Sequence, residues 1–315
     1  MKILIGYDGS EGADAGLEGL RRAGLPPRDV EALVVTVAEV WLPSPPGDEV
    51  VDDTFPSQIP EAVKRMRERA ARLVEQAEAL AERGAERVRS VFPQWAVGHE
   101  AQSGSPAFEL LRRADEWQPR LVVVGSQGRT ALGRFVLGSV SQKVLTEART
   151  SVHVARRATG SGESAARVVL GVDGSPGARA AVRAVAARSW TPGSEVRVVV
   201  AQDLMKAFPV SLLAAPAEES ADGVRGAGQA QAEQFAATAL EELRAGLGDG
   251  GVTVSSVVDD GAPKQALVRL AEEFGADCIF TGATGYSSRV ERFLLGSVSA
   301  AVAARAHCSV EVVRG

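Results

Sequence analysis

Short runs of valine, isoleucine and leucine alternate along this chain with longer segments in which apolar residues recur every three or four positions. In the first half, the apolar runs predict strands at 2–7, 32–38, 88–91 together with 95–100, 120–124 and 151–155. The helical spacing predicts helices near 10–23, 61–83, 106–116 and 139–148. Continuously apolar strands are typical of a parallel sheet covered on both faces, and the alternation of strand and helix predicts a doubly wound α/β fold.

Local signals mark the ends of these elements. Ser10 and Ser175 are the expected N-caps of two helices, and Pro176 takes the first helical position of the second one. Segment 42–60 is rich in proline and predicts a surface loop. The amphipathic segment after it predicts a helix that packs on the sheet.

The sequence of the first half returns in the second half. Residues 2–13 return at 167–178, and residues 104–126 return at 261–283. The offset between the copies is far longer than the period of a solenoid, so the chain is a domain duplication. We expect one domain at 1–157, a flexible linker at 158–166 and a second domain at 167–315.

Composition narrows the environment and the partners. The net charge is −5 with a pI near 5.5, which gives neither a basic field for nucleic acid nor a polybasic stretch for a membrane surface. No apolar window has the length of a membrane span or a signal peptide. Cys278 and Cys308 lie in apolar runs and are expected to be reduced, buried thiols of a cytoplasmic protein.

Candidate binding residues follow the predicted first and fourth strands. If the strand order is 3-2-1-4-5, a ligand crevice opens between the carboxyl ends of these two strands. Asp8 and Asp173 follow the first strands, and a Gly-x-x-Gly pair follows each fourth strand. Glycine lets the backbone N–H groups approach a ligand closely.

A third glycine, followed by serine, begins the next helix in each copy. The N-terminus of a helix offers unpaired N–H donors and the positive end of its dipole, so a phosphate chain can lie between it and the glycine pair. Asp8 would repel phosphate. It is expected either to accept from an adenine amino or ribose hydroxyl group, or to hold a divalent cation, or only to order its own turn.

Other chemistry finds no support in the sequence. There is no Walker-type GK[ST] motif, and the first strand does not lead into GxGxxG. His99, His153 and His307 share no metal-ligand spacing and are expected to be structural. The serines of the glycine motif are explained by N-capping and phosphate contact, and no positioned nucleophile and base can be assembled.

These residues resemble those of the universal stress protein family. The pattern G-x2-G-x9-G-[ST] matches the first copy and is similar to the nucleotide-binding signature of the ATP-binding branch. The resemblance implies two five-stranded parallel sheets of order 3-2-1-4-5 and a dimer-like pairing of the two domains. Because unpaired edge strands invite pairing, we expect the fifth strands, 151–157 and 309–315, to meet each other between the domains. It also implies an adenine nucleotide, ATP, as ligand, with Mg²⁺ entering only together with the nucleotide.

The resemblance carries the site over residue by residue. In the first copy the nucleotide-binding residues would be Gly6, Asp8, Val37, Gly125, Gln127, Gly128, Arg129, Gly138, Ser139, Val140 and Ser141. In the second copy they would be Gly171, Asp173, Val200, Gly282, Thr284, Gly285, Gly296, Ser297, Val298 and Ser299.

The second copy departs from the pattern at one place. Ten residues separate Gly285 from Gly296, whereas nine separate Gly128 from Gly138. We therefore expect the first half to bind nucleotide more tightly than the second. The leading hypothesis is a regulatory, non-catalytic ATP-binding stress protein. The alternatives are a nucleotide-free interaction module and an enzyme, either a slow ATPase or a transferase that acts on an activated nucleotide. A homodimer stays open.

Overall fold

The structure is a computed structural model that describes residues 1–40, 59–128, 137–157, 165–202, 217–284 and 295–315, with the side chains of 59, 60, 62 and 217–227 left aside. The loop expected at 42–60 falls almost entirely outside this part of the chain, and its last two positions already belong to a helix.

The strands form one ten-stranded sheet with the order β3-β2-β1-β4-β5-β10-β9-β6-β7-β8. The first half supplies β1 (Lys2–Gly6), β2 (Glu31–Ala38), β3 (Ala96–Ser103), β4 (Leu121–Gly125) and β5 (Ser151–Ala155). The second half supplies β6 (Arg167–Gly171), β7 (Glu195–Ala201), β8 (Thr253–Asp259), β9 (Cys278–Gly282) and β10 (Ser309–Val313). Each half is parallel in the order 3-2-1-4-5, so the predicted fold class is confirmed.

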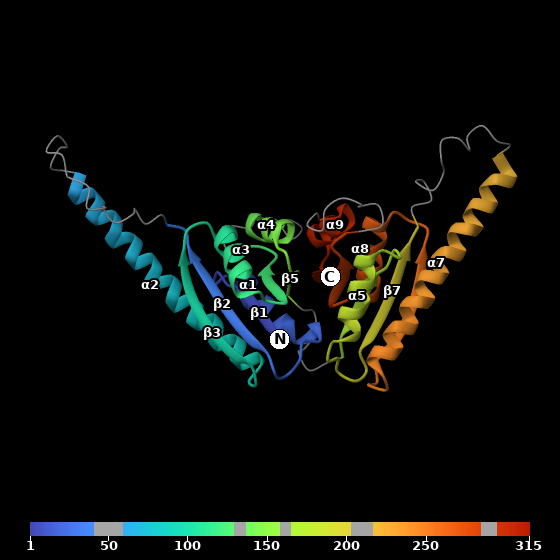
Figure 1. The fold of residues 1–315 in the computed structure, drawn as a ribbon, viewed down its shortest axis with the longest axis horizontal. Helices are drawn as coiled ribbons and strands as arrows, with labels where there is room; N and C mark the ends of the chain where they lie inside the picture. The colour runs from blue at the N-terminus through green and yellow to red at the C-terminus, as the bar shows by residue number, and fades with distance from the viewer. Residues whose placement is uncertain (41–58, 129–136, 158–164, 203–216, 285–294) are drawn as a thin grey trace.

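Helices cover both faces of the sheet. They are α1 (Glu11–Gly19), the 3₁₀ turn η1 (Leu20–Ala23), α2 (Ile59–Val91), α3 (Pro106–Trp117), α4 (Ser139–Glu147), α5 (Pro176–Ala186), α7 (Ala217–Leu247), α8 (Pro263–Phe274) and α9 (Ser297–Arg305). Figure 1 shows the two halves side by side, with α2 and α7 at opposite outer ends. On one face, α3, α4, α8 and α9 share a single apolar cluster that runs through both halves. On the other face, α1 with α2 and α5 with α7 bury separate clusters.

The predicted helix starts are confirmed. The Ser10 hydroxyl accepts from the N–H of Ala13 at 3.1 Å, and the Ser175 hydroxyl accepts from the N–H of Ala178 at 3.1 Å. Pro176 is the first residue of α5, where its missing N–H costs nothing. These caps fix where the chain turns from the carboxyl ends of β1 and β6 into the following helices.

The strand predicted at 88–91 is wrong, because this segment is the last turn of α2. Val88 is buried and continues a stripe formed by Ala77, Ala81 and Ala85. The spacing of these residues is that of one helix face, and Ala85 and Val88 belong to the apolar cluster that α1 and α2 bury against the sheet. The third strand of the first half consists of β3 alone.

The fifth strands pair with each other, as predicted. β5 and β10 are antiparallel, with Val154 opposite Val310, His153 opposite Glu311 and Val152 opposite Val312. Both strands are therefore interior strands of the sheet, and the tandem chain closes these two edges within itself.

Buried polar groups line this seam between the domains. Glu311 forms an ion pair with Arg188, and its Oε2 atom lies 3.2 Å from Nδ1 of His153. A second ion pair joins the domains near η1, where Nη2 of Arg22 lies 2.7 Å from Oδ2 of Asp277. The buried carboxylates of Glu311 and Asp277 thus each have an oppositely charged partner at this seam.

Candidate functional site

A cavity of about 700 Å³ lies beyond the carboxyl ends of β1, β2 and β4, at the position where the strand order reverses. All the residues predicted for the first copy line it, except Arg129, which lies outside the described residues. They are Gly6, Asp8, Val37, Gly125, Gln127, Gly128, Gly138, Ser139, Val140 and Ser141. The sequence therefore identified residues that converge on one cavity from four separate segments.

Asp8 orders the turn into α1 and also faces the glycine loop. Its Oδ1 atom accepts from the backbone N–H of Ser10 at 3.0 Å and from the Ser10 hydroxyl at 2.7 Å. A Cβ atom added to Gly128 would stand 3.3 Å from the other carboxylate oxygen, Oδ2. The turn-ordering role is thus present, and it leaves the carboxylate on the cavity wall.

The N-terminus of α4 opens into the cavity. Its N-cap is Gly138, with φ −63° and ψ 153°, which has no side chain with which to cap the first turn. N-capping, expected to explain Ser139 and Ser141, is therefore wrong for α4: the Ser141 hydroxyl donates instead to the carbonyl oxygen of Gly125 at 2.5 Å. The Gly138 N–H donates to the Ser126 carbonyl at 2.9 Å and holds the helix against the end of β4.

The glycines of this cavity have two different roles. A Cβ atom added to Gly138 would find its nearest described atoms at 3.6 Å, and one added to Gly125 would find them at 3.5 Å, both ordinary contact distances. The backbone does not require glycine there, so a side chain would instead occupy the cavity. Gly6 differs, because its added Cβ would approach Leu110 Cδ1 at 2.9 Å, which shows that glycine allows α3 to pack closely on β1.

One wall of the cavity was missed by the sequence prediction. It comes from α2 and consists of Leu73, Gln76, Ala77 and Leu80. Thr36 and Glu39 from the β2 end, with Pro106 and Leu110 of α3, add further lining. The apolar stripe of α2 was visible in the sequence, but the sequence does not show how far a 33-residue helix reaches past the strand ends.

The second domain repeats the plan of the first with a tighter loop. The Ser175 N–H donates to Asp173 at 3.0 Å, Gly296 is the N-cap of α9, and the Ser299 hydroxyl donates to the Gly282 carbonyl at 2.6 Å. Ser297 and Val298 form the first turn of α9, as predicted. Gly285 lies outside the described residues.

The loop after β9 rests directly on the start of α5. A Cβ atom added to Gly177 would stand 2.3 Å from the carbonyl oxygen of Thr284, whereas the equivalent atom on Gly12 would stand 3.7 Å from the carbonyl oxygen of Gln127. The Ser175 hydroxyl also contacts the Thr284 carbonyl, at 3.4 Å. The loop and helix therefore leave less space between them than in the first domain.

The strand register also changes one predicted equivalence. Gly6 pairs with Val35 and Gly171 pairs with Val199, so Val200 stands level with Thr36, and Ala201 stands level with Val37. Val200 belongs to the apolar cluster under α5 and α7.

Metal-binding clusters and membrane-spanning helices are not found among the described residues. No group of three or more His, Cys, Asp or Glu side chains in that part of the chain could hold a metal ion, and no helix in it is long and apolar enough to cross a membrane. Nε2 of His99 lies 3.4 Å from Oε1 of Glu78, and His153 lies in the seam between the domains.

Comparison with known proteins gives the family. The universal stress protein family model matches residues 1–156 and 165–314, so the chain belongs to this family and carries one copy in each half. A protein of Thermus aquaticus, "Universal stress protein in QAH/OAS sulfhydrylase 3'region", is 32% identical over 154 residues, which are 49% of this chain and 97% of that protein.

Two solved structures were matched to the chain, and the first shares its architecture. A universal stress protein from Archaeoglobus fulgidus matches 99% of this chain and 96% of its own, with a TM-score of 0.57 and 21% identity, which establishes likeness of fold. A universal stress protein solved in complex with cAMP is 29% identical over 48% of this chain and 98% of its own, with a TM-score of 0.33.

Proposed function

We propose that this tandem universal stress protein binds ATP in the first-domain cavity and acts through its ligand state, without catalysis. The observation that supports the proposal is the joining, in one cavity, of an aliphatic compartment and the N-terminus of α4, whose N-cap is a glycine without a side chain. A nucleotide has the matching two ends, a flat apolar base and an anionic phosphate chain.

The phosphates would lie at the start of α4. The backbone N–H groups of Ser139, Val140 and Ser141 belong to its first turn, where the helix dipole is positive. Gly125 and Gly128 add no side chains of their own to the facing loop. Mg²⁺ would enter with the phosphates, because the described part of the chain offers no metal-binding cluster of its own.

The base would lie toward α2. Val37, Leu73 and Leu80 supply aliphatic surface, and two exposed polar side chains also line this part of the cavity, Gln76 from α2 and Glu39 from the end of β2. A glutamine amide can accept from the adenine amino group and donate to the neighbouring ring nitrogen. Asp8 would accept from a ribose hydroxyl while it keeps its bonds to Ser10.

The second domain fits the nucleotide-free alternative better. The close approach of Thr284 to the start of α5 narrows the space in which the phosphates would lie. We therefore propose that each chain holds one nucleotide at ATP concentrations that saturate the first domain. The second domain would serve pairing and partner contact, and the protein would act in the cytoplasm, where nucleotide is abundant.

Two measurements test the proposal. Denaturing the purified protein should release a compound with adenine absorbance, or calorimetric titration of ligand-free protein with ATP should show one site per chain. Titration with cAMP, which lacks the β and γ phosphates, should show weaker binding.

A matched pair of variants then locates the site. Asp8→Ala should weaken ATP binding and Asp173→Ala should leave it unchanged, although both remove the same bond to a serine N–H. Equal effects of the two variants, or no ATP binding by the parent protein under any condition, would contradict the proposal.

A further inference from the structure

The two edge strands of the sheet, β3 and β8, differ in how their outward backbone groups are bonded. In β3, the N–H of Ala96 donates inward to Val30 at 2.9 Å, so the backbone groups of residues 97, 99 and 101 point away from the sheet. In β8, the N–H of Thr253 donates inward to Ser194 at 2.9 Å, so those of residues 254, 256 and 258 point away. These outward groups are the ones that another strand would bond to.

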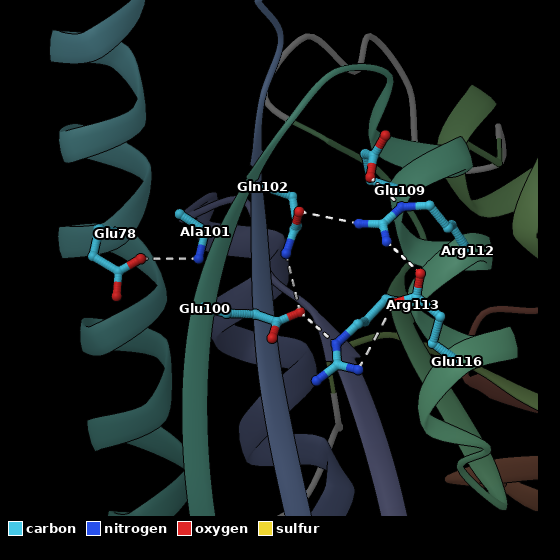
Figure 2. A network of polar contacts seen from close by, with 8 residues as sticks. All are labelled: Glu78, Glu100, Ala101, Gln102, Glu109, Arg112, Arg113 and Glu116. Atoms are coloured by element: carbon cyan, nitrogen blue, oxygen red, sulfur yellow. Dashed lines mark hydrogen bonds and ion pairs between the residues drawn. The ribbon is translucent and has the colours of Figure 1, made fainter.

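The β3 edge is capped by side chains from α2. The Glu78 carboxylate accepts from the N–H of Ala101 at 2.9 Å, and Arg89 donates to the carbonyl oxygen of Val97 at 2.7 Å. Figure 2 shows Glu78 reaching from α2 to the backbone of β3, with the charged residues of α3 on the other side of the strand. Two of its outward backbone groups are bonded to charged side chains, which protects this edge against pairing with another strand.

The β8 edge has no such cap. Among the described residues, no side chain bonds to the outward backbone groups of Val254, Ser256 and Val258. The segment 252–258 reads VTVSSVV and contains neither a charged residue nor a proline. Lysine, proline and charged side chains are devices that sequences use to protect an edge strand, and this segment carries none of them, so its outward backbone groups are available for pairing.

We propose that β8 pairs antiparallel with β8 of a second copy of this chain, about a twofold axis at Ser256. Val254 would then lie opposite Val258 of the second copy, and each facing pair would exchange two hydrogen bonds. The acidic Asp259 and Asp260 would lie at opposite ends of the pairing, whereas a parallel pairing would align these like charges. A second copy fits because an uncharged valine and serine strand is complementary to itself, and a twofold contact closes at the dimer.

The molecule already uses this form of contact once. β5 and β10 are equivalent strands of two equivalent domains, and they pair antiparallel in the middle of the sheet. A β8 contact would extend the same sheet across two chains. The β8 edge lies at the far end of the sheet from β3, away from the first-domain cavity, so the dimer should form without ATP.

The test measures mass in solution against protein concentration. Light scattering after size exclusion, or sedimentation equilibrium, should give a dimer for the full chain without nucleotide. Ser256→Pro removes one outward N–H and should weaken dimerisation by at least about tenfold, while Ser256→Ala keeps the N–H and should dimerise normally. A parent protein that stays monomeric, or a dimer that survives Ser256→Pro, overturns the proposal.

Two further measurements keep the test decisive if Ser256→Pro misfolds. In the parent protein, hydrogen exchange of the Val254, Ser256 and Val258 amides should slow as concentration rises. The double variant Glu78→Ala, Arg89→Ala uncaps the opposite edge and should produce species larger than the dimer. Amide exchange that does not depend on concentration would also overturn the proposal.

Discussion

Replacing Gly138 by valine should abolish ATP binding and leave the fold intact. Gly138 has extended backbone angles, φ −63° and ψ 153°, which a β-branched residue adopts readily. The nearest described atoms lie 3.6 Å from an added Cβ, so we expect the free energy of unfolding to change by less than about 1 kcal/mol. The added methyl groups would instead occupy the space in front of the first turn of α4.

The loss of affinity follows from the donors at that turn. A hydrogen bond from a backbone N–H to a charged phosphate contributes roughly 1.5–3 kcal/mol. Displacing the phosphates from two of these donors therefore costs about 3–6 kcal/mol, which is a loss of roughly 10²–10⁴-fold in affinity. Gly138→Ala adds one carbon and should give an intermediate loss.

Isothermal titration calorimetry at fixed Mg²⁺ measures the affinity, and thermal unfolding checks the fold. The matched control is Gly296→Val, at the N-cap of α9, where φ is −65° and ψ is 146°. This control should bind ATP as the parent protein does, because the proposed ligand lies in the first domain. Near-normal ATP affinity in Gly138→Val, with an unchanged melting temperature, would refute the reasoning that the phosphates lie at α4.

Three further predictions concern the closed loop, the seam and the thiols. Gly177→Ala should destabilise the protein by about 1–3 kcal/mol in urea unfolding, because its Cβ would overlap a loop carbonyl at 2.3 Å, whereas Gly12→Ala should be within about 0.5 kcal/mol of the parent. At Glu311, burial raises the carboxyl pKa, but Arg188 and the other seam partner lower it more, so the folded pKa is below the ordinary value of 4.5. Its contribution to stability is present above that value and is lost as pH falls through the folded pKa; Glu311→Gln should cost about 3–5 kcal/mol at pH 7 and show a shallower loss in acid. Cys278 and Cys308 are both buried, and burial raises the pKa of the Cys308 thiol to about 12. Neither thiol should therefore react with a disulfide reagent at pH 8 until the protein unfolds.

The sequence predicted most of the architecture because the two signals that carry it are local. Alternating apolar runs and helical spacing specify strands and helices, and the repeat shows that one plan is used twice. The strand predicted at 88–91 failed because two valines three residues apart fit a helix face as well as a short apolar strand. Only the packing of Val88 on the sheet distinguishes the two.

The candidate site was predictable where its residues follow strand ends. Topology places those ends together, so Asp8 and the glycines meet in one cavity. The α2 wall was not predictable, because the position of Gln76 depends on the length of the helix and its angle to the sheet. The equivalence of Val37 with Val200 failed by one residue, since aligned valines do not specify strand register.

The seam explains why pairing through the fifth strands stays within one chain. If β5 met β5 of another chain in the present register, His153 would lie opposite its own copy, and if β10 met β10, Glu311 would lie opposite a second buried carboxylate. Either arrangement leaves buried groups without partners, which costs several kcal/mol. Pairing His153 with Glu311 gives the carboxylate and Nδ1 of the imidazole a partner each, and the linker keeps the two strands at high effective concentration. With this contact satisfied internally and β3 capped by α2, β8 is the sheet edge of the described fold at which another copy could bind, so self-association and nucleotide binding can be altered by separate mutations.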